Sequence, residues 1–145
     1  MAIEITPNLA FAHSVLGQAY AFSGNSDFGM GQTQYAIQVS PRDPLLGVMY
    51  GGCGIACFAA GDYDGCVQWS GQAGRHRPPF TVSFRIVAAA LENLGRIDES
   101  RDTTRIFLSH APGATVSASV QQMPWNLSEH QEALAEGLRK AGLPE

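Results

Sequence analysis

A glycine followed by a proline seventeen residues later occurs three times in this chain. The glycines are Gly24, Gly61 and Gly95, and the prolines are Pro41, Pro78 and Pro112. The same interval of seventeen separates Pro7 from Gly24, whereas Pro41 lies twenty residues before Gly61. The pattern indicates an internal repeat built from seventeen-residue halves, with three additional residues in the middle unit.

Each half of the repeat has the length of one helix and one turn. A segment of this size holds roughly three to four helical turns and a short connection. Glycine can take the left-handed conformation that ends a helix, and proline cannot sit in a helix interior. We therefore predict an all-α fold of helical hairpins. The predicted units are 8–41, 42–78 and 79–112, after the remnant of a preceding unit in 1–7 and before a C-terminal cap in 113–145.

Local signals predict where particular helices begin and end. Asp43 is the predicted N-cap of one helix, with Pro44 as its first residue. Ser128 and Gln131 have the spacing of a capping box, which predicts a helix start at Ser128. Gly142 is predicted to end that last helix.

The repeat resembles the tetratricopeptide repeat, which places Leu-Gly, Tyr, Gly, Ala and Pro at fixed offsets over roughly 34 residues. The first unit matches with Leu16, Gly17, Tyr20, Gly24, Ala36 and Pro41. The later units keep the register with Gly54, Cys57, Gly61, Ala73 and Pro78, and with Ala88, Leu91, Gly95 and Pro112. The resemblance implies an α–α superhelix in which Gly17, Gly54 and Ala88 lie where paired helices touch.

The C-terminal sequence EGLRKAGLPE carries a narrower resemblance. It is similar to the end of tetratricopeptide regions in bacterial proteins that carry a class III nucleotidyl cyclase or a DNA-binding domain at the N-terminus. This implies a non-enzymatic module for protein or peptide binding or for self-association, within a larger signalling or regulatory protein. The alternative that it implies is a regulatory tail that couples a signal to an adenylate or guanylate cyclase domain elsewhere in the parent protein.

The family resemblance also implies a concave groove lined by the first helix of each unit. The candidate binding residues that it places there are Gln18, Phe22, Ile55, Phe58, Arg85, Glu92 and Asn93. Exposed Phe22, Ile55 and Phe58 would form an apolar strip suited to a protein or peptide. The alternative is that the C-terminal cap folds into the groove and buries this strip.

No motif in the chain calls for catalysis, a metal or a cofactor. The three cysteines, Cys53, Cys57 and Cys66, occupy places where the repeat needs core residues, and cysteine packs as a small hydrophobic residue. The sequence DYDG, starting at Asp62, lacks the later glycine and glutamate of a calcium loop and is interpreted as a helix start. We therefore expect no catalytic, metal-binding or cofactor-binding residues.

Charge and hydropathy bear on partners and location. The net charge of −4 argues against nucleic acid as a partner. The uncharged stretch 45–60 has sixteen residues, fewer than the roughly 20 that a membrane-spanning helix needs. With no secretion signal recognised, the cysteines are expected to be reduced thiols in the cytoplasm.

The N-terminal end is the expected site of self-association. Residues 2–5 have the character of a helix end whose partner helix is missing from the chain. Residues 11–20 would then present apolar surface that a preceding repeat would cover. Pairing of two copies could cover the same surface, since a two-fold dimer needs one self-complementary patch. We therefore predict a homodimer through this end.

Overall fold

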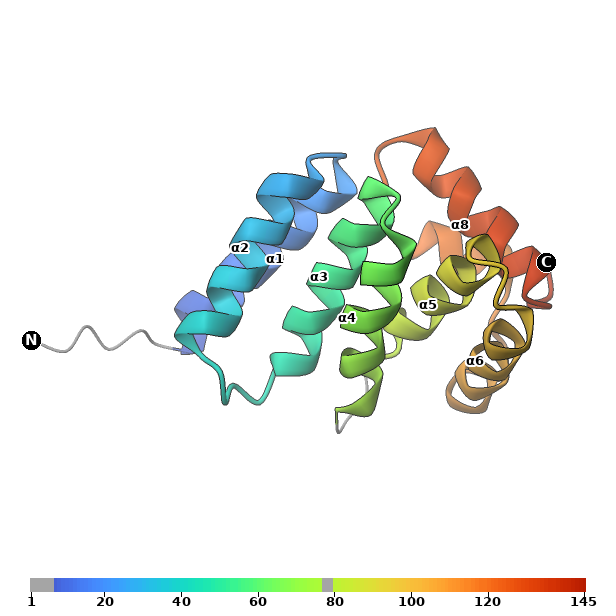
Figure 1. The fold of residues 1–145 in the computed structure, drawn as a ribbon, viewed down its shortest axis with the longest axis horizontal. Helices are drawn as coiled ribbons and strands as arrows, with labels where there is room; N and C mark the ends of the chain where they lie inside the picture. Colours follow the sequence, from blue (N-terminus) through green and yellow to red (C-terminus); the bar gives the residue numbers. More distant parts are fainter. Residues whose placement is uncertain (1–6, 77–79) are drawn as a thin grey trace, which may run out of the picture.

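The computed structural model describes residues 7–76 and 80–145, and these ranges contain helices and no strands (Figure 1). The helices are α1 (Pro7–Phe22), α2 (Ser26–Val39), α3 (Leu46–Ala60), α4 (Tyr63–Arg75), α5 (Val82–Asn93), α6 (Ile97–His110), α7 (Val116–Gln121) and α8 (Ser128–Lys140). The prediction of an all-α fold is confirmed. The predicted helix end at residues 2–5 and Pro78 lie outside the described residues.

The first six helices form three consecutive hairpins, α1–α2, α3–α4 and α5–α6, which stack side by side along the molecule (Figure 1). Helix α3 packs against both α1 and α2, and α5 packs against α4 and α3. Each hairpin therefore buries apolar surface of the one before it. This is the arrangement of an all-α helical repeat fold.

The turns within the hairpins depend on glycines with positive φ. In the described residues the positive-φ glycines are Gly24, Gly61 and Gly95, one in each hairpin turn, and Gly142, which follows α8. After α3, the Gly61 N–H donates to the carbonyl of Phe58 (3.1 Å) and the Asp62 N–H donates to the carbonyl of Cys57 (2.9 Å). These are the two bonds of a Schellman motif, which satisfies carbonyls at the helix end. The predicted glycine helix ends are confirmed.

Small residues allow the two helices of each hairpin to approach closely, as predicted. A Cβ on Gly17 would lie 2.7 Å from the carbonyl oxygen of Gly29, and a Cβ on Gly54 would overlap the hydroxyl of Ser70. In the third hairpin the Ala88 carbonyl accepts a hydrogen bond of 2.8 Å from the Ser100 hydroxyl. The predicted small-residue contacts are therefore present in all three hairpins.

Two predicted N-caps differ from those in the structure. Helix α3 begins at Leu46, and the Asp43 carboxylate instead accepts from the Leu45 N–H (2.8 Å) in the turn before the helix. Helix α8 begins at Ser128 as predicted, but its N-cap is Leu127, which makes no side-chain capping bond. The Gln131 amide does reach back, but it donates to the carbonyl of Trp125 (2.6 Å). In both places the side chain that was expected to cap the helix instead forms a hydrogen bond with a backbone group of the segment before the helix.

The C-terminal segment folds back along the hairpins. Helix α8 packs against α5 and α7, and the connection before it reaches the C-terminal ends of α1 and α3. The chain end is fixed by a bond of 2.7 Å from the Val116 N–H to the carbonyl of Pro144. Across the described ranges, no helix has both the length and the apolar character that crossing a membrane requires.

Candidate interaction surface

Exposed apolar side chains gather on the first hairpin. Seven of the eleven large hydrophobic side chains that are exposed in the described residues belong to α1 and α2. We call them the α1–α2 surface: Leu9, Phe11, Val15, Leu16, Tyr20, Phe28 and Tyr35. An apolar group of this kind on one hairpin indicates an interaction site, since scattered single exposures need no such explanation.

Edge-to-face aromatic contacts hold part of the α1–α2 surface in place. The rings of Tyr20 and Phe28 lie 4.4 Å apart between centroids, and those of His13 and Tyr35 lie 4.8 Å apart. The side chains of His13 and Gln32 also form a hydrogen bond of 2.6 Å. Each pair joins α1 to α2, so the surface is ordered before any partner binds. This order lowers the entropy cost of association.

The α1–α2 surface is almost free of charge. The chain has 22 charged residues, 9 basic and 13 acidic, yet residues 7–41 contain only one, Asp27. Charged residues are depleted in the cores of protein interfaces, where aromatic residues are enriched. A hairpin exposed to water on its outer side would normally carry charged residues at such positions. The composition therefore favours a protein partner on this surface.

The predicted apolar strip of the concave side is buried. Phe22, Ile55 and Phe58 are 8%, 0% and 2% exposed. The indole of Trp125 packs on Phe22 (4.6 Å between centroids) and on Phe58 (5.7 Å). The prediction of an exposed strip is therefore wrong, and the alternative applies: the C-terminal segment covers Phe22 and Phe58. The repeat pattern could not reveal this, because Trp125 lies far along the chain from all three.

The four polar candidates of the groove do not converge on one point. Gln18 donates to the carbonyl of Val48 (3.4 Å), and Asn93 donates to the carbonyl of Ala89 (2.9 Å). Arg85 donates to the Gln122 side chain (2.6 Å), and its guanidinium lies 5.2 Å from the centroid of the Phe107 ring. Burial lowers the pKa of Arg85 below its ordinary value.

Glu92 and Asn93 line a cavity of about 270 Å³ between α5 and α8. One carboxylate oxygen of Glu92 is buried without a partner among the described residues. Lys140 lines the same cavity from α8 but forms its ion pair with Glu136, at 3.4 Å. The predicted groove residues therefore face separate neighbours, and the structure does not bring all of them into one site.

The three cysteines are buried in α3 and α4 as free thiols. The pKa of Cys53 and of Cys57 is raised to about 12, mainly by burial. Burial also raises the pKa of Cys66. The thiols are therefore protonated at neutral pH and poor nucleophiles. Within residues 7–76 and 80–145, no three His, Cys, Asp or Glu side chains are arranged to hold a metal ion.

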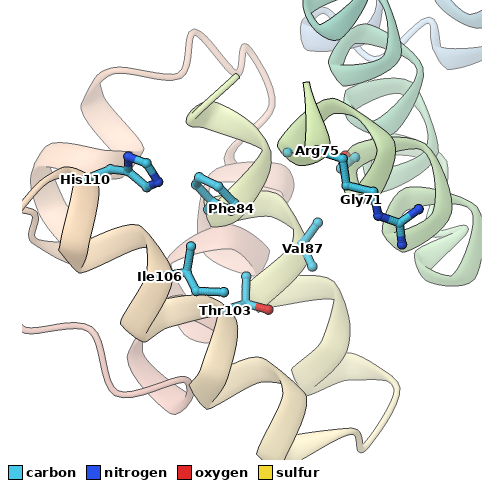
Figure 2. Close-up of a pocket in the computed structure, with 9 residues that line it drawn as sticks. Gly71, Arg75, Phe84, Val87, Thr103, Ile106 and His110 are labelled. Atoms are coloured by element: carbon cyan, nitrogen blue, oxygen red, sulfur yellow. The ribbon is translucent and has the colours of Figure 1, made fainter. Parts of the chain in front are cut away.

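A second groove, which the sequence did not reveal, lies between α4, α5 and α6 and has a volume of about 500 Å³ (Figure 2). Phe84 and Val87 of α5 face Ile106 and Thr103 of α6 across it. The His110 ring stacks on Phe84 at 5.4 Å and 12°. On the α4 side the groove is lined by Arg75 and by three small residues, Ser70, Gly71 and Gly74. The spacing Gly71–Gly74 is the sequence signal that could have indicated it.

Comparisons with protein-family models, with curated proteins and with solved structures give no match to this chain. The class of the protein, an all-α helical repeat protein, therefore rests on its own structure. The tetratricopeptide resemblance stays a prediction from sequence.

Proposed function

We propose that this chain is a non-enzymatic protein-interaction module of the tetratricopeptide type, which self-associates through the α1–α2 surface. The observation that carries the proposal is the gathering of exposed aromatic and aliphatic side chains on a hairpin with a single charge. Such a surface loses little polar solvation when it is covered and gains hydrophobic burial. The buried free thiols support a reducing, cytoplasmic setting.

A second copy is the partner that this surface suits best. A partner rich in acidic side chains would bury carboxylates against aromatic and aliphatic side chains without an ion-pair partner, which is unfavourable. Two copies of an uncharged surface have no such conflict. Of the charged residues only Asp27 lies within the hairpin, so two-fold pairing here keeps most like charges apart.

The size of the surface predicts a weak and reversible dimer. Helix α1 has 16 residues, which corresponds to a length of about 24 Å. Two adjacent helices are about 20 Å wide, so the hairpin offers a projected area of roughly 500 Å². Stable complexes bury about 800 Å² on each partner. We therefore expect dissociation constants in the micromolar range or weaker, where concentration controls the state of the molecule.

Light scattering over a wide concentration range tests the proposal. The wild-type chain should change from monomer to dimer with rising concentration. Phe11→Glu and Leu16→Glu should each weaken the dimer at least about tenfold, because a charge would be buried at the contact without a partner. The matched control is Ile106→Glu on α6, which changes a similarly exposed side chain away from the hairpin and should leave the dimer intact.

A wild-type chain that is monomeric at every concentration would refute self-association. Equal weakening by Ile106→Glu would show that the α1–α2 surface is not the specific contact. The alternative function, a tail that regulates a cyclase domain, stays a prediction from the resemblance at the C-terminus.

A further inference from the structure

Residues 122–127, which we call the strap, connect α7 to α8 without helical structure and cross the C-terminal ends of α1 and α3 (Figure 1). The backbone N–H of Asn126 donates to the carbonyl of Phe22 at the end of α1 (3.0 Å). The Leu127 side chain lies against Gly24, so that a Cβ there would be 2.8 Å from Leu127 Cδ1. The strap thus binds the first hairpin with a backbone hydrogen bond and an apolar contact.

Trp125 is the anchor of the strap. Its side chain is 3% exposed and sits among the rings of Phe22, Phe58 and His130, with centroid distances of 4.6, 5.7 and 5.3 Å. These rings come from α1, α3 and α8. A single buried aromatic side chain beside a backbone hydrogen bond is also how an extended peptide is held by a folded partner.

The fit of the strap to its site is incomplete. The indole N–H of Trp125 is buried and has no acceptor among the described residues. His130 donates from Nε2 to the carbonyl of Ala59 (3.1 Å), and its buried Nδ1 has no partner among those residues either. Each unpaired buried polar group opposes burial of the side chain that carries it. The strap therefore stays in place partly because the chain tethers it there, which raises its effective concentration.

We propose that the Trp125 site is a binding site for an extended segment of a partner protein that carries a large aromatic side chain, and that the strap occupies this site in the same chain until such a segment replaces it. The partner segment would place its aromatic side chain between Phe22 and Phe58 and its backbone N–H on the Phe22 carbonyl. This inference goes beyond self-association, because it concerns the strap and its contacts rather than the α1–α2 surface. It is tested by peptide binding rather than by the oligomeric state.

A labelled synthetic peptide of residues 120–128 (VQQMPWNLS) tests the proposal in trans. In the full-length Trp125→Ala variant the site lacks its own anchor. Fluorescence anisotropy should show saturable binding of the peptide to this variant, at least about tenfold tighter than to the wild-type chain, whose strap competes from a tethered position. The same peptide with alanine in place of tryptophan should not bind.

The control for the protein is Trp69→Ala, which removes the other tryptophan of the chain, on α4, and leaves the strap in place. It should bind the peptide no better than the wild-type chain. Failure of the peptide to bind a Trp125→Ala variant that keeps its helical circular dichroism would overturn the proposal. Equal binding of the alanine peptide would overturn it as well.

Amide hydrogen exchange tests the same idea in the unaltered chain, and so covers the case in which Trp125→Ala does not fold. If the strap can leave its site, the Asn126 amide should exchange through local opening, faster than buried amides in α5. Exchange of the Asn126 amide only at the rate of global unfolding would show that the strap is a permanent part of the core, and the proposal would fail.

Discussion

Single glycines decide where each hairpin turns. Gly61 has a φ of +76°, and a Cβ placed on it would meet no atom within 4 Å. Its side-chain position is therefore open, and only the backbone conformation requires glycine. A side chain in this conformation brings Cβ close to the following carbonyl oxygen, which is unfavourable by about 1–2 kcal/mol.

Gly61→Ala should therefore lower the free energy of unfolding by about 1–2 kcal/mol. Gly71 is the matched control, because it lies inside α4 and a Cβ there also meets nothing within 4 Å. Gly71→Ala should raise the free energy of unfolding by roughly 0.4–1 kcal/mol, since alanine favours the helix and restricts the unfolded chain. Urea titrations measure both. The same sign for the two changes would contradict the assignment of Gly61 as a required left-handed residue.

Gly54 represents the other use of glycine, which is close helix contact. Gly54→Ala should lower the free energy of unfolding by about 1–3 kcal/mol, because the added methyl group would overlap the Ser70 hydroxyl. Adding Ser70→Ala removes that hydroxyl, so the double variant should recover part of the loss. Denaturant titrations of the two single variants and the double variant form a complete cycle. Strict additivity would mean that Gly54 and Ser70 do not meet.

Ala88 occupies the equivalent place in the third hairpin, and its side chain is buried. Ala88→Leu should overpack the contact between α5 and α6 and lower the free energy of unfolding by about 1–3 kcal/mol. Thermal or urea unfolding measures the change. A neutral result would mean that the register assigned to this hairpin is incorrect.

Residue-level predictions from sequence succeeded where the required conformation is local. The glycines that end helices were found because their positive φ is a property of single positions. The N-cap predicted at Asp43 was wrong, because a short polar side chain caps a turn and a helix by the same hydrogen bond. Only the surrounding packing decides which of the two it caps.

At the scale of elements, α3 and α4 carry the three buried thiols. The pKa of Cys53 and of Cys57 is raised from 9.0 to about 12, mainly by burial. Between these two values the unfolded chain releases thiol protons that the folded chain retains. Thermodynamic linkage then requires the free energy of unfolding to fall as pH rises through this range. The stabilising contribution of the two buried thiols is fully present below pH 9.

We therefore expect the free energy of unfolding to fall between about pH 9 and pH 11, as measured by urea titration under reducing conditions. A Cys53→Ala/Cys57→Ala variant should be less stable at neutral pH because it loses buried atoms. The free energy of unfolding of this variant should nevertheless fall less steeply with pH, because two of the buried thiols are missing. Titration of tyrosine and lysine is common to both chains. Equal slopes in the two chains would contradict burial of the thiols.

Elements within the repeat were predictable, and the strap was not. The spacing of glycine and proline predicted the hairpins α1–α2, α3–α4 and α5–α6 because each repeat packs on its neighbour in the same way. The burial of Phe22 by Trp125 depends on a contact between residues more than a hundred positions apart. A periodic sequence pattern contains no information about such a contact, so the sequence could not show whether the concave side is open or covered.

At the scale of the whole molecule, charge and exposure divide the chain into two regions. Residues 7–41 supply most of the exposed large apolar side chains and one charge. The described residues from 42 onward carry nearly all of the charge. This division supports the proposal that the first region contacts protein, whereas the charged side chains of the second favour contact with water. The expected apolar character of residues 11–20 agrees with the exposure of Phe11, Val15, Leu16 and Tyr20.

This division predicts that association depends weakly on salt. A contact made of uncharged side chains gains little from Coulomb attraction, so its dissociation constant should change less than about threefold between low salt and 0.5 M sodium chloride. Sedimentation velocity at two salt concentrations measures it. Loss of the dimer at high salt would point to a contact made by the charged residues beyond residue 41.

The central claim, self-association through the α1–α2 surface, is tested most directly by backbone amide NMR spectra of the unaltered chain recorded over a dilution series. We predict that dilution shifts the resonances of residues 9–35, including those of Phe11, Leu16 and Tyr20, along a single binding curve. Resonances of α5 to α8 should stay unchanged. Shifts confined to α5–α8, or spectra that do not change with concentration, would contradict the claim.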